Sequence, residues 1–305
     1  MPEQKGARQE RVTDDRRFAL RSLLFVPGDA DKKIDKALDT PADVVILDLE
    51  DAVAPSAKRA ARLLACGVLR GDRRKPVAIR INAVDTPWYL EDLGAIGGLR
   101  PDIVMLPKCE AAADIKRLCD QLSVLEAAAS VPVGDIAILP LVTETAAALR
   151  NTDYRSVSER LCALGFAGED LSADLGVEAR DSLGMNPLLE QARRAVAMAA
   201  AAADVPAIDT PFPDPHATAA LAREAGDAAR LGFAGKMCIH PGQIDAVHAA
   251  FQPSEATLQW ARGVVRALAQ SAQNGVTLLD GKMIDRAHLR LAERYLRHEA
   301  PEKAQ

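Results

Sequence analysis

Several short apolar runs in this sequence end in charged residues of the types that enzymes use for metal and acid–base chemistry. The run over residues 136–144 ends at Glu144, and the run over residues 161–170 ends at Asp170. If the runs are parallel strands, one strand–helix unit separates these acids, and we expect them to be neighbours. Two adjacent carboxylates suit a hard divalent cation such as Mg²⁺, which takes oxygen ligands and keeps water molecules that a substrate can displace. Capping of the helices that follow is the alternative role for both acids.

A second group of charged residues follows or interrupts the earlier runs. Asp48, Glu50 and Asp51 come at the end of one run, and Arg80 lies inside the next. An unpaired charge within an apolar strand is costly, so Arg80 needs an acidic or anionic partner. A structural ion pair with Asp48 or Glu50 explains Arg80 as well as substrate binding does, and the two roles are compatible. The three acids alone are equally consistent with loop and capping roles.

The apolar runs alternate with amphipathic or alanine-rich stretches, which predicts strands alternating with helices. The expected strands are residues 22–27, 44–51, 76–82, 102–108, 136–144, 161–170, 205–211 and 235–241, and the expected helices include 31–38, 56–69, 111–129, 187–203 and 215–231. Eight strand–helix units predict an α/β fold, a closed (β/α)8 TIM barrel whose strands converge at their carboxyl ends on the active-site face. An open doubly wound sheet is the alternative, but no strand is followed by a Gly-x-Gly-x-x-Gly fingerprint.

The expected domain organisation is a barrel with extensions at both ends. Residues 1–17 predict a flexible N-terminal tail, residues 18–252 the barrel, and residues 253–300 a C-terminal helical extension. Within the extension we expect a helix over 254–273, a loop over 275–285 and a charged helix over 286–298. The extension is too short for a core of its own, so we expect it not to be a separate domain.

Composition narrows the class of protein. Half of the residues (49%) are apolar and few (4%) are aromatic, which favours a core of aliphatic side chains in helices and parallel strands. The net charge of −5, with scattered basic residues, argues against nucleic acid or an anionic membrane as the main partner. The five cysteines form no Cys-x-x-Cys pair, and there is no signal-peptide core or membrane-spanning run, so we expect a cytoplasmic protein with reduced thiols.

An ordered set of motifs resembles the citrate lyase β-subunit-like family of the HpcH/HpaI aldolase superfamily, with its malyl-CoA and citramalyl-CoA lyases. The resemblance runs from Arg21 to about Asp285, nearly the whole chain. The motifs are Arg21-Ser-Leu-Leu-Phe-Val-Pro-Gly28, Asp48-Leu-Glu-Asp-Ala-Val53, Ile79-Arg-Ile-Asn82, Leu106-Pro-Lys108, Glu144-Thr145, Gly165-Phe-Ala-Gly-Glu-Asp-Leu171, Asp174-Leu-Gly176 and Gly235-Lys-Met-Cys-Ile-His-Pro241.

The resemblance implies roles for particular residues. It implies that Glu144 and Asp170 hold Mg²⁺ and that Arg80 contacts the substrate beside the metal. It also implies that an aspartate in the C-terminal segment acts in a neighbouring subunit's site, and Gly281-Lys-Met-Ile-Asp285 makes Asp285 the candidate. Glu50 and Asp51 are further candidates for substrate binding, and Arg21 is a candidate for the phosphates of coenzyme A.

The implied function is a Mg²⁺-dependent carbon–carbon lyase with a CoA thioester substrate. It would cleave or form a 3-hydroxyacyl-CoA such as citramalyl-CoA, malyl-CoA or citryl-CoA, with acetyl-CoA and a 2-oxo acid as the other partners, and would be a homo-oligomer, a trimer or hexamer. Four alternatives stay open: a citrate lyase β subunit acting on an acyl-carrier-protein thioester, a CoA-independent 2-oxo-acid aldolase, a non-catalytic binding paralogue, and a thioesterase in which water replaces the ketone.

Overall fold

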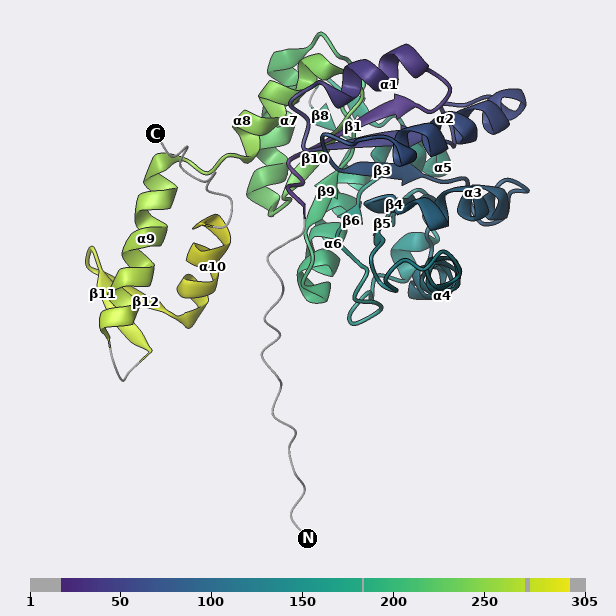
Figure 1. Ribbon diagram of the computed structural model, residues 1–305. Helices are drawn as coiled ribbons and strands as arrows, with labels where there is room; N and C mark the ends of the chain where they lie inside the picture. Colours follow the sequence, from purple (N-terminus) through teal and green to yellow (C-terminus); the bar gives the residue numbers. More distant parts are fainter. Residues whose placement is uncertain (1–17, 183, 272–274, 297–305) are drawn as a thin grey trace. The chain divides into compact units, whose positions relative to one another are not determined.

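All eight apolar runs contain a strand of one parallel sheet (Figure 1). The strands are β1 Ser22–Pro27, β2 Val44–Asp48, β3 Val77–Arg80, β4 Ile103–Leu106, β5 Ala137–Pro140, β6 Leu164–Gly165, β9 Ala207–Asp209 and β10 Gly235–Cys238. Their order is β5-β4-β3-β2-β1-β10-β9-β6. Two parallel bridges, Ile138 to Leu161 and Leu141 to Gly165, join the ends of this order. The sheet is therefore nearly closed into a barrel, and the α/β TIM-barrel prediction is confirmed.

This computed structural model describes residues 18–182, 184–271 and 275–296. The tail expected over residues 1–17 lies outside the described residues. The chain divides into two compact units, Met1–Val247 and His248–Gln305, and each is described by itself. No helix among the described residues has the length and apolar character needed to cross a membrane.

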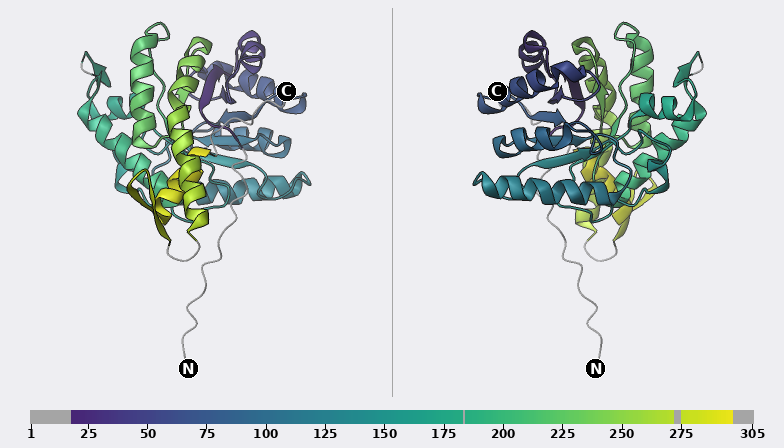
Figure 2. Two further views of the ribbon diagram at one scale, coloured as in Figure 1. Left: turned by 90° about the vertical axis from the view of Figure 1, so that its left-hand side faces the viewer. Right: turned by 90° about the vertical axis from the view of Figure 1, so that its right-hand side faces the viewer.

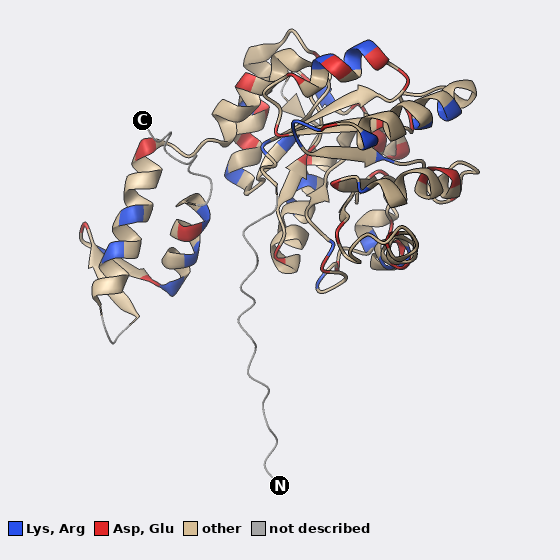
Figure 3. Cartoon of the chain, in the orientation of Figure 1, with Lys and Arg blue, Asp and Glu red and all other residues tan. Residues whose placement is uncertain are grey.

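Helices connect most of the strands and surround the sheet of the first unit (Figure 2). They are α1 Asp31–Leu38, α2 Lys58–Arg70, α3 Tyr89–Ile96, α4 Ala112–Ala128, α5 Gly168–Leu175, α6 Pro187–Ala203 and α7 Thr218–Leu231, with short 3-10 turns η1 Pro55–Ala57, η2 Gly97–Leu99, η3 Ala148–Arg150 and η4 Pro241–Gln243. Helix α8 Ile244–Phe251 follows and contains the boundary between the two units. A two-stranded antiparallel pair, β7 Arg180–Asp181 and β8 Gly184–Met185, lies between α5 and α6. Basic and acidic residues are interspersed along the helices (Figure 3).

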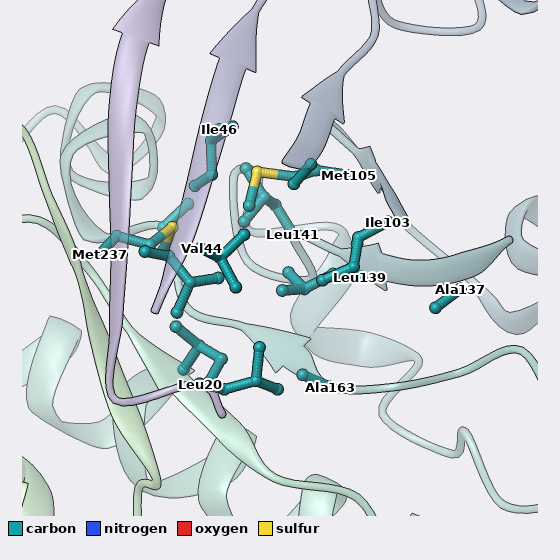
Figure 4. Close-up of a cluster of buried hydrophobic side chains, with 14 residues drawn as sticks. Leu20, Val44, Ile46, Ile103, Met105, Ala137, Leu139, Leu141, Ala163 and Met237 are labelled. Atoms are coloured by element: carbon teal, nitrogen blue, oxygen red, sulfur yellow. The ribbon is translucent and has the colours of Figure 1, made fainter. Parts of the chain in front are cut away.

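The barrel interior is filled by alternate residues of the strands (Figure 4). Val44 and Ile46 of β2 face Ile103 and Met105 of β4 within this cluster, which also contains residues from β1, β3, β5, β9 and β10. Successive side chains of a strand point to opposite faces, so every second residue contributes to the interior. The aliphatic composition of the runs is thereby accounted for, because the remaining residues pack against the helices.

A network of buried charges lies behind β9 and β10, on the helix side of the sheet. Nζ of Lys236 donates to Asp209 over 2.6 Å and to Glu224 of α7 over 2.8 Å. Arg193 of α6 donates two hydrogen bonds to Asp209, and Arg180 of β7 donates two to Glu224. Burial would raise the pKa of Glu224, but the hydrogen bond from Arg180 and the charge of Lys236 lower it to about 2. These ion pairs tie α6, α7 and β7 to the sheet.

The second unit contains α9 Glu255–Gln270, a hairpin of β11 Val276–Leu279 and β12 Lys282–Asp285, and α10 Arg286–Leu296. The hairpin replaces the loop that we expected over residues 275–285. Its turn residues Asp280 and Gly281 both have positive φ angles, 50° and 74°, as a two-residue hairpin turn of type I′ requires. A small apolar cluster forms within this unit, contrary to the expectation from its length. It contains Ala261, Val264, Ile284 and Ala292, with Trp260, Leu279 and Tyr295 packed against it.

Candidate active site

Charged residues at the carboxyl ends of β2 and β3 continue the inward-facing rows of the barrel core. Val44 and Ile46 pack inside the barrel, and strand alternation puts Asp48 on the same face. On β3, Ala78 packs inside and Arg80 follows on that face. Asp48 and Arg80 are also direct partners in the register of the two strands. The sequence thus places a carboxylate beside a guanidinium on top of an aliphatic core.

Arg80 and Asp48 form a two-point ion pair. Nε of Arg80 donates to Oδ1 of Asp48 over 2.8 Å, and Nη2 donates to Oδ2 over 2.6 Å. The guanidinium lies over the ring of Phe25, 4.8 Å from its centroid. Burial would raise the pKa of Asp48, but the hydrogen bonds and charge of Arg80 outweigh that effect and lower it. The ion-pair partner that the sequence required for Arg80 is therefore Asp48.

Glu50 lies between Arg80 and Lys108. Nη1 of Arg80 is 3.2 Å from Oε2 of Glu50, and Nζ of Lys108 donates a hydrogen bond to Oε1. Burial raises the pKa of Glu50 in spite of both cations. Asp51 is more exposed, with Oδ1 3.9 Å from Nζ of Lys108. Lys58 holds the backbone of this segment, because its ammonium donates to the carbonyl of Glu50 over 2.6 Å.

Glu144, which follows β5, is buried, and only one of its two carboxylate oxygens has a hydrogen-bond partner among the described residues. Its Oε2 accepts a hydrogen bond from the backbone N–H of Lys108, whereas its buried Oε1 has no hydrogen-bond partner within the described ranges. Burial raises the pKa of Glu144 to about 8, and the charges of Glu50 and Asp170 add to the effect. A buried carboxyl with an unsatisfied oxygen and acidic neighbours is an environment that a cation would stabilise.

Asp170 lies in the first turn of α5, whereas we expected it to end a strand. The strand β6 is only two residues long, and the helix begins at Gly168. Asp170 is half-buried, and burial raises its pKa while Arg80 and Lys108 act in the opposite direction. Glu144 and Asp170 follow the bridged strands β5 and β6 at their carboxyl ends, and the charge of Asp170 raises the pKa of Glu144, so both acids lie at the same part of the rim. The structure thus brings together Arg80, Glu50, Asp51, Glu144 and Asp170 from the predicted set.

Lys108 and Asp48 were not among the predicted site residues. Lys108 has a φ of 49°, a left-handed conformation that is uncommon for a residue with a side chain and that often marks functional sites. In this conformation its backbone reaches Glu144 while its ammonium reaches Glu50. The position of Lys108 directly after an apolar run was the available signal. Asp48 was expected only as an ion-pair partner of Arg80 or a loop acid, although its alternation with Val44 and Ile46 places it on the inward face.

Arg21 is not brought together with the other predicted residues. It precedes β1, and its partner Asp43 precedes β2, so both lie at the amino ends of the strands, opposite the rim with Glu144. Nε and Nη2 of Arg21 donate to the two oxygens of Asp43 over 3.0 and 2.8 Å. Its observed contacts tie β1 to β2.

Asp285, the remaining predicted residue, belongs to the second unit. It ends β12 and immediately precedes α10. Its Oδ1 accepts a hydrogen bond from the backbone N–H of Ala287 over 2.9 Å and lies 2.8 Å from Nδ1 of His288. The hydrogen bond from His288 lowers the pKa of Asp285.

No cluster of three or more histidine, cysteine, aspartate or glutamate side chains suited to a metal occurs in the described part of the chain. The pair Glu144 and Asp170 offers two carboxylates. Mg²⁺ is commonly held by one or two carboxylates, with water or substrate oxygens in the other positions. The donor set therefore fits Mg²⁺ better than a metal that needs a complete protein cage.

Comparisons with known proteins give consistent results. Citrate lyase subunit beta of Escherichia coli (strain K12) is 32% identical over 281 residues, which cover 89% of this chain and 92% of that protein. The (3S)-malyl-CoA thioesterase of Cereibacter sphaeroides (strain ATCC 17029 / ATH 2.4.9) is 32% identical over 287 residues, covering 90% and 93%. Among solved structures, protein CitE of Mycobacterium tuberculosis in complex with magnesium, acetoacetate and coenzyme A is 34% identical, with a TM-score of 0.72 and coverage of 92% and 98%.

The model of the family described as HpcH/HpaI aldolase/citrate lyase matches residues 21–241. That range contains all eight strands of the barrel and the residues Arg80, Glu144 and Asp170 at its rim. The chain belongs to the HpcH/HpaI aldolase/citrate lyase family.

Proposed function

We propose that this protein is a Mg²⁺-dependent lyase that cleaves a 3-hydroxyacyl-CoA into acetyl-CoA and a 2-oxo acid, or joins them in reverse. The observation that carries the proposal is the buried, unpartnered Oε1 of Glu144 at the same part of the rim as Asp170. With a pKa of about 8, the carboxyl of Glu144 is readily protonated when no cation is bound. A metal ligand must be ionised, and a bound cation would stabilise that ionised form. The M. tuberculosis relative, which was solved in complex with magnesium, acetoacetate and coenzyme A, supports this assignment.

Glu144 and Asp170 would hold the cation, with the remaining positions left to water and substrate. When bound, Mg²⁺ supplies an electrophile that favours ionisation of the substrate's hydroxyl and orients the adjacent carboxylate. The backbone N–H of Lys108 fixes one oxygen of Glu144 and leaves the other for the metal.

Arg80 would stabilise the negative charge that shifts during cleavage. Asp48 accepts from Nε and from one hydrogen of Nη2, which fixes the plane of the guanidinium. The second hydrogen of Nη2 and those of Nη1, which lies 3.2 Å from Glu50, can serve other acceptors. Donors preorganised in this way need no rearrangement as the charge develops. Glu50 and Asp51 would line the same substrate-binding region, with Lys108 between them.

Cleavage removes a proton from the substrate's hydroxyl and adds one to the acetyl carbon. The substrate's hydroxyl loses its proton to water, and the electron pair of that oxygen forms the carbonyl of the 2-oxo acid as the carbon–carbon bond breaks. The pair from that bond becomes the enolate of acetyl-CoA, whose carbon takes one proton. Asp285 is the proposed donor: its carboxylate takes a proton from solvent, equal to the one that the hydroxyl released, and passes it to the enolate carbon. In the condensing direction the carboxylate removes the same proton. We propose that Asp285 acts in the site of a neighbouring subunit of a homo-oligomer, a trimer or hexamer.

A second candidate is hydrolysis of the thioester. The Cereibacter sphaeroides relative named (3S)-malyl-CoA thioesterase favours it, because its similarity covers 90% of this chain. Cleavage and hydrolysis release different products from the same substrate, a 2-oxo acid with acetyl-CoA or a hydroxy acid with free CoA. An acyl-carrier thioester, as in a citrate lyase complex, would be the alternative form of the substrate.

The test is to incubate the protein with malyl-CoA, citramalyl-CoA and citryl-CoA, with Mg²⁺ and with a chelator, and to quantify both sets of products. We expect a 2-oxo acid from at least one substrate only with Mg²⁺, and its loss in Glu144→Gln and Asp170→Asn. Glu110→Gln, at an exposed acid on the loop after Lys108, is the matched control and should remain active. Metal-independent cleavage, or cleavage by Glu144→Gln at the wild-type rate, would contradict the proposal.

A further inference from the structure

The carboxylate of Asp285 is held on one side by α10. Its Oδ1 accepts from the backbone N–H of Ala287 over 2.9 Å and of His288 over 3.3 Å, and lies 2.8 Å from Nδ1 of His288. In the opposite direction, the backbone N–H of Asp285 lies 3.2 Å from the same ring nitrogen. All of the carboxylate's contacts converge on Oδ1, so His288 and α10 together fix the rotation of the carboxylate.

The other oxygen of Asp285 is left for a different partner. No residue in the described ranges donates a hydrogen bond to Oδ2, and the side chain is 37% exposed. Ile284, the preceding residue of β12, packs into the small core of this unit, so strand alternation turns Asp285 to the opposite, outer face of the hairpin. Val276, its partner across the hairpin, is exposed on that face. The carboxylate thus presents Oδ2 outward with its orientation fixed.

We infer that His288 is a positioning residue for the proton transfer at Asp285: its ring holds Oδ1 so that Oδ2 faces the acetyl carbon of the substrate. This inference rests on the proposed role of Asp285 as the acid and base of the reaction. His288 does not touch substrate. It acts by fixing the carboxylate before the reaction, as second partners of catalytic groups do.

Reciprocal helix capping is the competing explanation for the same contacts. A residue in the position of His288 commonly accepts from the backbone N–H of the capping residue, and glutamate and glutamine are the preferred residues there. Capping requires that the side chain at position 288 accept a hydrogen bond from the backbone N–H of Asp285. Positioning requires that it donate a hydrogen bond to Oδ1 of Asp285. Variants at this one position can therefore separate the two functions.

The experiment measures exchange of the acetyl-CoA methyl protons with deuterated water in the presence of Mg²⁺ and pyruvate, with unfolding temperature and KM values measured in parallel. His288→Glu keeps the cap acceptor but removes the donor, and His288→Gln can supply a donor again. We expect His288→Glu to lower the exchange rate about 10- to 100-fold, with little change in KM or unfolding temperature, and His288→Gln to recover part of the rate. Ser254→Ala, which removes the cap of α9 in the same unit, is the control and should exchange at the wild-type rate.

Asp285→Asn separates failure of this inference from failure of the proposed function. If Asp285→Asn abolishes exchange while His288→Glu exchanges like the wild type, His288 is only a helix cap and the inference is overturned. If Asp285→Asn itself exchanges normally, the proposed role of Asp285 is wrong and the inference fails with it.

Discussion

Arg80 stands directly beside Asp48 in the parallel sheet, and its guanidinium donates hydrogen bonds of 2.8 and 2.6 Å to the two oxygens of that carboxylate. The side chain of Asp48 is 2% exposed and that of Arg80 is 11% exposed. Asp48 also accepts from the backbone N–H groups of Glu50 and Ala52. A single buried carboxylate therefore fixes both the guanidinium and the loop that carries Glu50.

Arg80→Lys should preserve the charge but lose the two-point pairing, because an ammonium cannot donate in the planar geometry of a guanidinium. If the proposed role is correct, kcat should fall by about 100-fold or more, with a smaller change in the affinity for Mg²⁺. Steady-state kinetics and calorimetric titration with Mg²⁺ test this. The conservative substitution Arg59→Lys, at an exposed position of α2, is the control. A wild-type kcat in Arg80→Lys would exclude a role for the guanidinium geometry.

Glu224 should make folding stability depend on pH in the acid range. Its pKa is lowered to about 2 in the folded protein, from an ordinary value near 4.5. A lowered pKa contributes stability that is complete above the unfolded value and is lost as the pH falls through the folded value, here between about pH 4.5 and 2. Glu224→Gln should cost roughly 3 kcal/mol near pH 7, since it leaves Arg180 and Lys236 without their shared partner.

Urea unfolding of the wild type and Glu224→Gln at pH 7 and pH 3 measures this effect. The difference in free energy of unfolding between the two proteins should shrink at pH 3. Glu255→Gln, in an exposed pair with Arg262, should change stability little at either pH. A difference that stays constant with pH would mean that Glu224 does not titrate as described.

Two glycines should respond to alanine substitution with opposite signs. A Cβ at Gly235, the first residue of β10, would lie 1.8 Å from the carbonyl oxygen of Leu20, so Gly235→Ala must separate β10 from the chain entering β1. We expect destabilisation by about 3 kcal/mol or more. Gly226 in α7 has open space around its Cβ position, and Gly226→Ala should stabilise the protein by about 0.5–1 kcal/mol. Equal effects in thermal unfolding would contradict the packing described at β10.

The barrel was predictable from the sequence because its strands are buried on both faces and read as aliphatic runs. The site was predictable in part, since inward-facing strand residues such as Arg80 stand out among apolar neighbours. Lys108 was missed because its role depends on a left-handed backbone, which one-dimensional patterns do not reveal. Asp170 was assigned to a strand because the apolar run continues into α5 without a break.

The C-terminal hairpin was missed for a different reason. The Asp280-Gly281 pair is a strong turn signal, but the flanking strands are four residues each and do not show a clear alternation of polar and apolar residues. The end of the barrel at which Arg21 lies was predictable, because Arg21 precedes the first strand and the active-site face is at the carboxyl ends; only its pairing with Asp43 required the structure. Asp43, its partner, precedes the next strand.

Mixing inactive variants should test whether Asp285 serves a neighbouring subunit. In randomly mixed oligomers of Glu144→Gln and Asp285→Asn chains, about a quarter of sites would combine an intact Glu144 with an intact Asp285 from the next chain. We expect cleavage activity near that fraction of the wild type, measured after chain exchange is verified by mass spectrometry. Verified mixed oligomers without activity would place Glu144 and Asp285 in the same chain's site, or remove Asp285 from it.

Glu144 and Asp170 are proposed to bind the catalytic cation jointly. The most direct measurement is anomalous diffraction from crystals of the wild type and of Glu144→Gln soaked in Mn²⁺, a magnesium substitute, with pyruvate. We predict one strong peak in the wild type within about 2.0–2.3 Å of an oxygen from each carboxylate, with pyruvate beside it, and no such peak in the variant. A peak elsewhere, or the two carboxylates facing apart around an empty space, would contradict the claim.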